Sequence, residues 1–188
     1  GIEPPTEVSP EARAEDIDVL KKGLQLCASY GFTSLHNMDG NRYQLELLRE
    51  IENEGALLCR TDIPFHLTPE KDIASLSEAA ALRAEFATDR LSSKRVKVFM
   101  DGVIDSSTAV LVDDYADTPG SRGDLLHSPE RFRAIATEAD KLGFQIAVHA
   151  IGDGAIRNTL DGYEAAQKAN GVRDARHRIE HIELLNPA

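Results

Sequence analysis

Two distant stretches of the sequence repeat one order of helix, Gly-Phe and strand, and each strand ends on a histidine. The first opens with Ser9-Pro10-Glu11 and the second with Ser128-Pro129-Glu130. Serine caps helices, proline is tolerated at the first helical position because its missing N–H needs no partner there, and glutamate interacts favourably with the helix dipole. Gly31 and Gly143 are placed to end the two helices. We therefore expect two strands, each preceded by a capped helix.

The rest of the chain continues this alternation. Predicted helices begin near residues 10 and 129 and span about 41–54, 73–87 and 153–169. Predicted strands span about 32–36, 56–65, 96–100, 144–149 and 178–182. Strands that alternate with helices are typical of parallel sheets with right-handed crossovers. The sequence therefore predicts an α/β fold, and both a doubly wound sheet and a (β/α)8 barrel fit the pattern. Five strands are fewer than the eight of a closed barrel.

Composition excludes several classes of protein. At 188 residues one domain is expected. Asp and Glu outnumber Lys and Arg by 32 to 21, and no basic stripe is interleaved with aromatics, so nucleic acid is not an expected partner. No apolar run approaches the roughly 20 residues that cross a bilayer, and no leader is evident, so we expect no membrane contact and a cytoplasmic location. Cys27 and Cys59 lie in apolar patterns without CxxC spacing, which favours buried thiols.

Lys97 is the first candidate for chemistry. In the predicted strand 96–100 it alternates with apolar residues that share the opposite face. If that apolar face packs on helices, Lys97 points into a barrel interior, where loss of solvent lowers the pKa of its amine. A neutral amine can form a Schiff base with a carbonyl substrate, or combine with carbon dioxide to give a carbamate that bridges cations. A lysine that reaches solvent at a strand end fits the sequence equally well, since buried lysines are rare.

Two histidines end the strands that follow. His149 stands at the carboxyl end of its strand, where barrel enzymes build active sites, and a neutral imidazole is a good zinc ligand. Around His181 the alternation is poor: either His177 and His181 share the interior face, or the strand is short and only His181 reaches the rim. A lone histidine is more often a satisfied polar residue than a ligand. Together with Lys97, however, the histidines follow successive parallel strands, whose carboxyl ends meet at one rim.

Segments between the predicted elements hold further polar candidates. Residues 103–127 show little periodicity and several aspartates, which indicates a lid or binding loop whose acids form a solvated face rather than a calcium loop. Asp153 follows Gly152 in a tight turn, and we expect its carboxylate to cap the next helix. Among the remaining histidines, only His36 ends a predicted strand at the same rim.

These motifs resemble the amidohydrolase superfamily, specifically the YtcJ-like branch known as amidohydrolase family 3. The resemblance rests on Gly31–His36, Val96–Ser106, His149–Asp153 and Arg178–His181, and it spans nearly the whole chain. It implies that residues 1–188 are the central part of a TIM (β/α)8 barrel with parallel strands, about strands 2 to 6.

The same resemblance implies roles for the candidate residues. Lys97, His149 and His181 correspond to metal ligands on the fourth, fifth and sixth barrel strands, and this lysine is carboxylated in many members of the superfamily. The implied cofactor is one or two divalent cations, with zinc as the expected ion. Implied substrate-binding or supporting residues are Asp101, Gly102, Asp105, Asp153 and His36.

The resemblance also implies what this stretch lacks. No His-x-His pair occurs, so we expect the first-strand ligands to be absent, together with the last strands, their general-base aspartate and the terminal β-sandwich. The implied activity is hydrolysis of amide-type C–N bonds in a small molecule, with this stretch inactive alone and able to self-associate through open barrel edges. Two alternatives remain: a Schiff-base lyase or aldolase that uses Lys97, and a non-catalytic binding or assembly domain.

Overall fold

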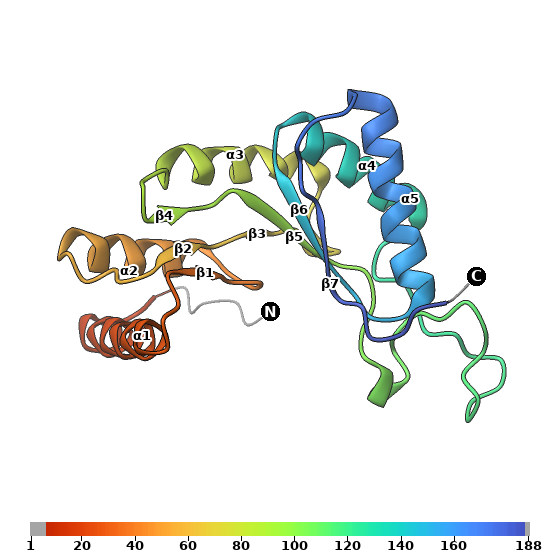
Figure 1. Cartoon of the computed structure of the whole chain (residues 1–188), viewed down its shortest axis with the longest axis horizontal. Helices are drawn as coiled ribbons and strands as arrows, with labels where there is room; N and C mark the ends of the chain where they lie inside the picture. The colour runs from red at the N-terminus through yellow and green to blue at the C-terminus, as the bar shows by residue number, and fades with distance from the viewer. Residues whose placement is uncertain (1–6, 187–188) are drawn as a thin grey trace. The chain divides into compact units, whose positions relative to one another are not determined.

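Strands separated by helices run through the computed structural model, which describes residues 7–186 (Figure 1). These residues divide into two compact units: unit 1 contains residues 7–66 and 78–95, and unit 2 contains 67–77 and 96–186. The predicted α/β class is confirmed, and the fold is that of a partial TIM barrel. Within the described residues the strands form two sheets and no closed barrel. No described helix is both long and apolar enough to span a membrane.

Unit 1 has helices whose ends follow from local sequence signals. Its elements are α1 (Pro10–Ser29), β1 (Ser34–His36), α2 (Arg42–Asn53), β2 (Arg60–Asp62), β3 (Phe65–His66), most of α3 (Leu76–Glu85), and β4 (Leu91–Ser92). Ser9 and Asn41 cap α1 and α2 by accepting backbone hydrogen bonds. Gly31 and Gly55 then take the left-handed conformation after these helices. The predicted boundaries of both helices are confirmed.

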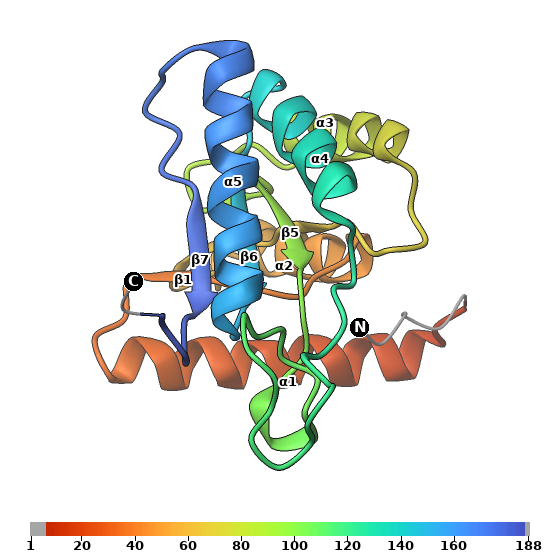
Figure 2. The ribbon, with the colours of Figure 1, turned by 90° about the vertical axis from the view of Figure 1, so that its right-hand side faces the viewer.

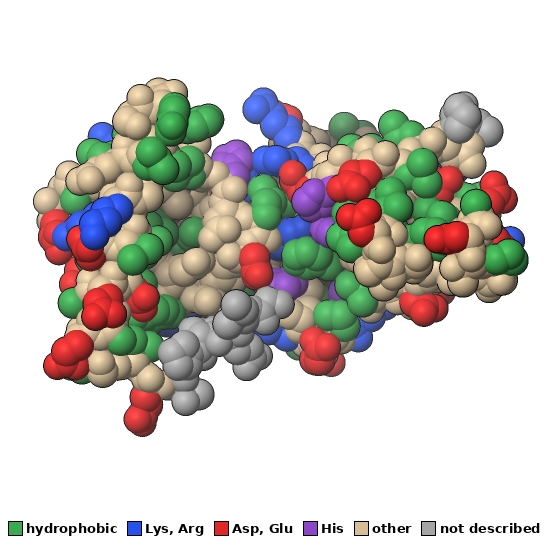
Figure 3. All heavy atoms as spheres, turned by 90° about the horizontal axis from the view of Figure 1, so that it is seen from below, with side chains coloured by type: hydrophobic (Ala, Val, Ile, Leu, Met, Phe, Trp, Pro, Cys, Tyr) green, Lys and Arg blue, Asp and Glu red, His purple; other side chains and the backbone are tan. Residues whose placement is uncertain are grey.

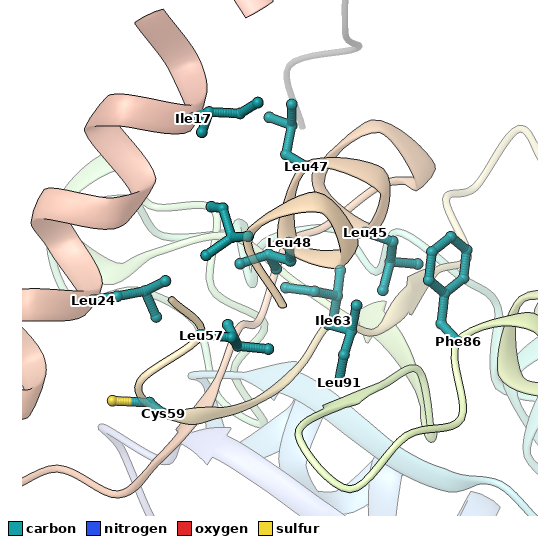
Figure 4. Close-up of a cluster of buried hydrophobic side chains, with 11 residues drawn as sticks. Ile17, Leu24, Leu45, Leu47, Leu48, Leu57, Cys59, Ile63, Phe86 and Leu91 are labelled. Atoms are coloured by element: carbon teal, nitrogen blue, oxygen red, sulfur yellow. The ribbon is translucent and has the colours of Figure 1, made fainter. Parts of the chain in front are cut away.

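One face of the unit 1 sheet carries the hydrophobic core. β1, β2 and β4 pair in parallel in that order, and the register places Leu35 beside Thr61 and Thr61 beside Leu91. These residues lie on one face of the sheet. That face packs against side chains of α1 and α2 and forms a buried cluster with them (Figure 4). The cluster consists of Ile17, Leu24, Leu45, Leu47, Leu48, Ile51, Leu57, Cys59, Ile63, Phe86 and Leu91.

Unit 2 layers two helices on a sheet. Its elements are η1 (Ile73–Ser75), β5 (Arg95–Phe99), η2 (Ile104–Ser106), α4 (Pro129–Lys141), β6 (Gln145–Ala150), α5 (Asp153–Asn170) and β7 (Arg178–His181). β5, β6 and β7 are neighbours in that order, and β6 pairs with β7 in parallel. Figure 2 shows α4 and α5 side by side against these strands. Gly162 of α5 permits this packing, because a Cβ there would lie 2.4 Å from the Phe132 ring of α4.

Several predicted elements need correction. The strand expected at 56–65 is two short strands, β2 and β3, because Pro64 supplies no N–H for a continuous ladder. The helix expected at 73–87 begins with the turn η1, which Asp72 caps, and ends at Glu85. β4 was not predicted, since two residues carry no periodic signal.

Asp153 also differs from its expected role. Gly152 occupies the N-cap position of α5 without any side-chain cap, and Asp153 is the first residue of the helix. Its Oδ1 accepts a hydrogen bond of 2.8 Å from the backbone N–H of Val112. The Asp153 carboxylate therefore ties the long loop to the start of α5. It does not cap the helix, because Gly152 occupies the N-cap position.

Candidate metal centre

Lys97 is buried in the middle of β5. Only 1% of its surface is exposed, and Val96 and Val98 on the opposite face are fully buried as well. Nζ lies 4.0 Å from the centroid of the Phe99 ring and donates a hydrogen bond of 3.4 Å to the Val98 carbonyl oxygen. A cation over an aromatic ring is stabilised electrostatically. Of the two placements that the sequence allowed for Lys97, the solvent-exposed one is excluded.

His149 and His181 lie against each other at the carboxyl ends of β6 and β7. Their ring centroids are 4.5 Å apart, and the Phe99 ring lies 4.8 Å from the ring of His149. The β6–β7 register pairs His149 with Glu180, so a regular strand would direct His181 to the other face. His181 instead has a φ of 81°, which redirects its side chain. Lys97, Phe99, His149 and His181 thus form one continuous chain of contacts.

The position of His177 decides between the two registers considered for the last strand. β7 begins at Arg178, so His177 precedes it at the amino end. Its Nδ1 accepts a hydrogen bond from the backbone N–H of Ile146 at 3.1 Å, and its Nε2 lies 3.2 Å from Oδ1 of Asp140. Only His181 reaches the carboxyl rim, and His177 is tied into the opposite end of the sheet.

The hydrogen bonds of His149 determine its tautomer. Nε2 lies 2.9 Å from the carbonyl oxygen of Gly102 and 3.6 Å from Oδ1 of Asp101. A carbonyl oxygen can only accept, so Nε2 carries the proton and the lone pair is on Nδ1. Histidines that bind metals commonly donate their second N–H to a carbonyl or carboxylate in this way.

The surroundings of His149 also favour its neutral form. Burial lowers the pKa of His149, and the charges of His181 and Lys97 lower it further. The Gly102 carbonyl and Asp101 oppose this change, but the net direction is downward. A neutral imidazole is the form that binds a metal cation.

Asp101 and Gly102 join the end of β5 to the long loop. The Asp101 carboxylate is 1% exposed and accepts backbone hydrogen bonds from Val110, Ile151 and Gly152 at 2.9, 3.0 and 2.9 Å. A Cβ on Gly102 would lie 2.0 Å from Oγ1 of Thr108, so the turn admits no side chain at Gly102. These two residues hold the loop against the residues that follow β6.

The other predicted site residues are outside this chain of contacts. Asp105 is exposed in η2. Asp153 bonds to Val112, as described above. His36 belongs to unit 1, where it ends β1 and is exposed.

Sequence reasoning missed the roles of two residues near the centre. Phe99 lies between Lys97 and His149, and its place on the Lys97 face of the strand was a signal that could have revealed it. Thr108 fixes the turn after Gly102, because its Oγ1 accepts from the backbone N–H of Val103 at 2.9 Å and its carbonyl oxygen accepts from that of Gly102 at 3.0 Å. No local sequence pattern identifies Thr108, because its partners Val103 and Gly102 lie five and six residues earlier in the loop.

The donor atoms fit part of a coordination sphere. In residues 7–186, no group of three or more His, Cys, Asp or Glu side chains is arranged to hold a metal ion. Two adjacent imidazoles could supply two nitrogen ligands, and Lys97 could add a third only after losing its positive charge. Catalytic zinc sites use three protein ligands and keep one open position.

Comparison with known proteins gives these residues a context. Residues 3–188 match the model of the Amidohydrolase family. The chain is 46% identical over 92 residues to Protein LONG AFTER FAR-RED 3 of Arabidopsis thaliana, covering 49% of this chain and 16% of that protein. It is 34% identical over 91 residues to YtcJ of Bacillus subtilis (strain 168), covering 48% of this chain and 17% of YtcJ.

Two solved structures share the fold. An uncharacterized metal-dependent hydrolase from Pyrococcus horikoshii OT3 superposes with a TM-score of 0.74 at 30% identity, covering 93% of this chain and 34% of that chain. An uncharacterized metal-dependent hydrolase from Pyrococcus furiosus superposes with a TM-score of 0.75 at 29% identity, covering 93% of this chain and 35% of that chain. The chain therefore spans only about a third of these structures and less of its curated relatives. Because the family match extends over residues 3–188 and the fold agrees with both structures, this chain belongs to the amidohydrolase family, as its motifs predicted.

Proposed function

We propose that the protein containing this chain is a metal-dependent hydrolase of amide-type C–N bonds, with Lys97, His149 and His181 as metal ligands. The observation that carries the proposal is the contact between the two imidazole rings, whose centroids are 4.5 Å apart, and their link through the Phe99 ring to the buried Lys97. Membership of the amidohydrolase family and the similarity to two metal-dependent hydrolases support it. The expected substrate is a small molecule.

Each residue has a distinct part in this proposal. A bound divalent cation, with zinc as the expected ion, would polarise the substrate carbonyl and lower the pKa of a bound water. His149 presents the lone pair of Nδ1, because Gly102 holds the proton on Nε2. Asp101 keeps the Gly102 turn and the end of β6 in place through its three backbone hydrogen bonds.

Lys97 is proposed to act as a carbamate. Its neutral amine would attack carbon dioxide, forming one N–C bond while a C–O π electron pair moves to oxygen, and the nitrogen would release a proton to solvent. The product is anionic, so it removes the repulsion that an ammonium would exert on a bound cation. It also provides oxygen ligands beside the two imidazoles. The burial of Lys97 favours this chemistry, because loss of solvent disfavours the charged amine. The Phe99 ring acts in the opposite direction, because it stabilises a cation at Nζ.

We further propose that the 188 residues do not hydrolyse substrate alone. The described donor atoms complete only part of a coordination sphere. A metal held by so few ligands would bind weakly.

Cobalt(II) titration of the purified chain tests the ligand assignment without needing a substrate. Cobalt(II) bound by histidine nitrogens gives visible absorption bands, and we expect His149→Ala and His181→Ala each to weaken binding by roughly tenfold or more. His66→Ala is the matched control, because His66 lies in unit 1 and pairs with Asp39. Unchanged affinity in both site variants would overturn the assignment.

The state of Lys97 needs a separate measurement. With ¹³C-labelled bicarbonate, a carbamate carbon resonance is expected in the wild-type NMR spectrum and not in that of Lys97→Arg. Borohydride reduction that instead couples a carbonyl compound to Lys97 would favour the Schiff-base lyase.

A further inference from the structure

Unit 1 has a polar sheet face that the proposed hydrolysis does not use. The parallel register places Ser34 beside Arg60, and it aligns His36 with Asp62 and Asp62 with Ser92. Since alternate residues of a strand point to opposite faces, these side chains lie on the face opposite the buried cluster of Figure 4. The sheet therefore carries its core on one side and polar side chains on the other.

A pocket of about 190 Å³ lies on this polar face. Three cationic side chains line it: Arg60, Arg90 and Lys94. Two acids line it as well, but Asp62 is only 6% exposed and its carboxylate already accepts hydrogen bonds from Arg95 and Ser92. With the charge of Asp62 balanced by Arg95, Asp89 alone opposes the three cations. The pocket is thus positively charged in a chain whose net charge is −11.

The two arginines of the pocket bond only to neutral oxygens. Nε and Nη2 of Arg60 donate to the hydroxyls of Ser34 and Thr33 at 3.1 and 3.3 Å. Arg90 donates from Nη1 to the Leu57 carbonyl at 3.1 Å. Across residues 7–186, neither guanidinium forms an ion pair with a carboxylate, and the same holds for the Lys94 amine.

Four other arginines of unit 1 behave differently. Carboxylates pair with Arg13, Arg42, Arg49 and Arg95. Acidic side chains are plentiful, at 32 against 21 basic ones, and they are spread over the face seen in Figure 3. Missing partners at Arg60 and Arg90 are therefore not explained by a shortage of carboxylates.

The register also places these two residues beside each other on adjacent strands. Thr61 pairs with Leu91, and the Thr61 N–H donates to the Arg90 carbonyl at 2.7 Å, so Arg60 and Arg90 precede neighbouring positions of adjacent strands. Like charges at such positions destabilise a sheet. An anion between them would remove the repulsion and accept the remaining guanidinium N–H groups. A phosphate group, with up to two negative charges and several acceptor oxygens, matches three cations better than a carboxylate does.

We propose that this pocket binds a phosphate group through Arg60, Arg90 and Lys94. The assignment is independent of the proposed hydrolysis, because no residue of the candidate metal centre takes part. The group could reach the pocket as the free ion or as part of a phosphate monoester, and the recognition chemistry is the same.

Titration of the full chain with inorganic phosphate, followed by amide NMR at constant ionic strength, tests the proposal. Saturable shifts confined to residues of β1, β2 and the Arg90–Lys94 segment are expected. Glycerol phosphate added in a parallel titration tells whether an esterified phosphate binds more tightly than the free ion. Shifts that do not saturate, or that sodium chloride or acetate reproduces, would overturn the proposal.

Variants assign the binding to the three cations. Arg60→Gln and Arg90→Gln should each weaken phosphate binding by roughly tenfold, the effect of losing one charged hydrogen-bond donor. Lys94→Gln should weaken it too and should leave the fold intact, because the Lys94 side chain is exposed. Arg157→Gln, an exposed arginine of unit 2, changes the net charge equally and should bind like the wild type. Wild-type affinity in folded Lys94→Gln and in either arginine variant would contradict the assignment.

Discussion

Both units contain parallel strands that alternate with helices, but the two sheets are buried to different extents. The paired strands of unit 1 have two or three residues, and one face carries the core while the other carries polar side chains. In unit 2, β5 and β6 have five and six residues, and nearly all are buried on both faces. A strand covered on both sides can hold a lysine away from water, and the candidate metal centre lies in that unit.

The side chains of the two proposed sites are held to different degrees by their surroundings. Lys97 and His149 are fixed by packing and by hydrogen bonds to the backbone, so their atoms are placed before any ligand arrives. Arg60 and Arg90 lie at an exposed face, where the proposed anion would offset their charges. The first arrangement suits bond-breaking chemistry, and the second suits reversible binding of an anion.

The largest expected effect tests the core of unit 2. Phe132→Ala removes a fully buried ring that packs against Gly162 and Tyr163, and it should lower the free energy of unfolding by about 3–5 kcal/mol in urea denaturation. Phe32→Ala is the control, since Phe32 is 58% exposed and should cost less than about 0.5 kcal/mol. Equal losses would show that burial does not distinguish the two positions.

A somewhat smaller loss is expected from the buried ion pair of unit 1. Arg95→Met leaves the Asp62 carboxylate without its cation, 2.5 Å away in the wild type, and should cost about 3 kcal/mol by the same measurement. Arg122→Met, which breaks the exposed pair with Asp114, should cost much less. If Arg95→Met retains wild-type stability, unit 1 does not depend on this pair.

Stability should also depend on pH through His177 in unit 2. Burial lowers the pKa of His177 and Arg173 lowers it further, and this outweighs the opposing effect of Asp140. The unfolded chain therefore binds a proton more readily, so the free energy of unfolding should fall as the pH drops below about 6.5, the ordinary histidine pKa. The fall should end once His177 is protonated in the folded state. Urea denaturation between pH 8 and pH 5 measures it, and His177→Gln should reduce the slope; an unchanged slope would contradict this origin.

The smallest effect belongs to the surface of α5. Lys168→Ala removes an exposed pair with Glu164 one helical turn away, and it should change the free energy of unfolding by only about 0.3–0.5 kcal/mol. The change should shrink further in high salt, because ions screen exposed charges. A loss comparable to that of Phe132→Ala would mean that surface charge, and not the core, governs unit 2.

Local signals predicted most of the fold. Ser9 and Ser128 cap helices as expected, and Gly31 and Gly143 adopt the left-handed conformation that follows a helix. Such signals act over one turn of chain, so the sequence contains all that is needed to read them. β4 escaped prediction because its two residues are a strand only through pairing with β2.

The candidate site was predictable in its members but not in its arrangement. Alternation along β5 and β6 predicted the strand positions of Lys97 and His149, and the structure links the two residues through the Phe99 ring. The direction of His181 depends on a φ of 81°, which no residue type at that position demands. Asp153 was assigned to a cap because its true partner, Val112, lies 41 residues away in the sequence.

By itself the sequence determined the α/β alternation, the helix ends and the family, because capping, periodicity and motif spacing are properties of neighbouring residues. Tertiary structure alone decided that Lys97 is buried, that the rings of His149 and His181 touch, and that Arg60 and Arg90 line one pocket. These facts depend on which surfaces come together when distant strands pair. Solvent exclusion and cross-strand contacts arise only then, and the chemistry proposed for both sites depends on them.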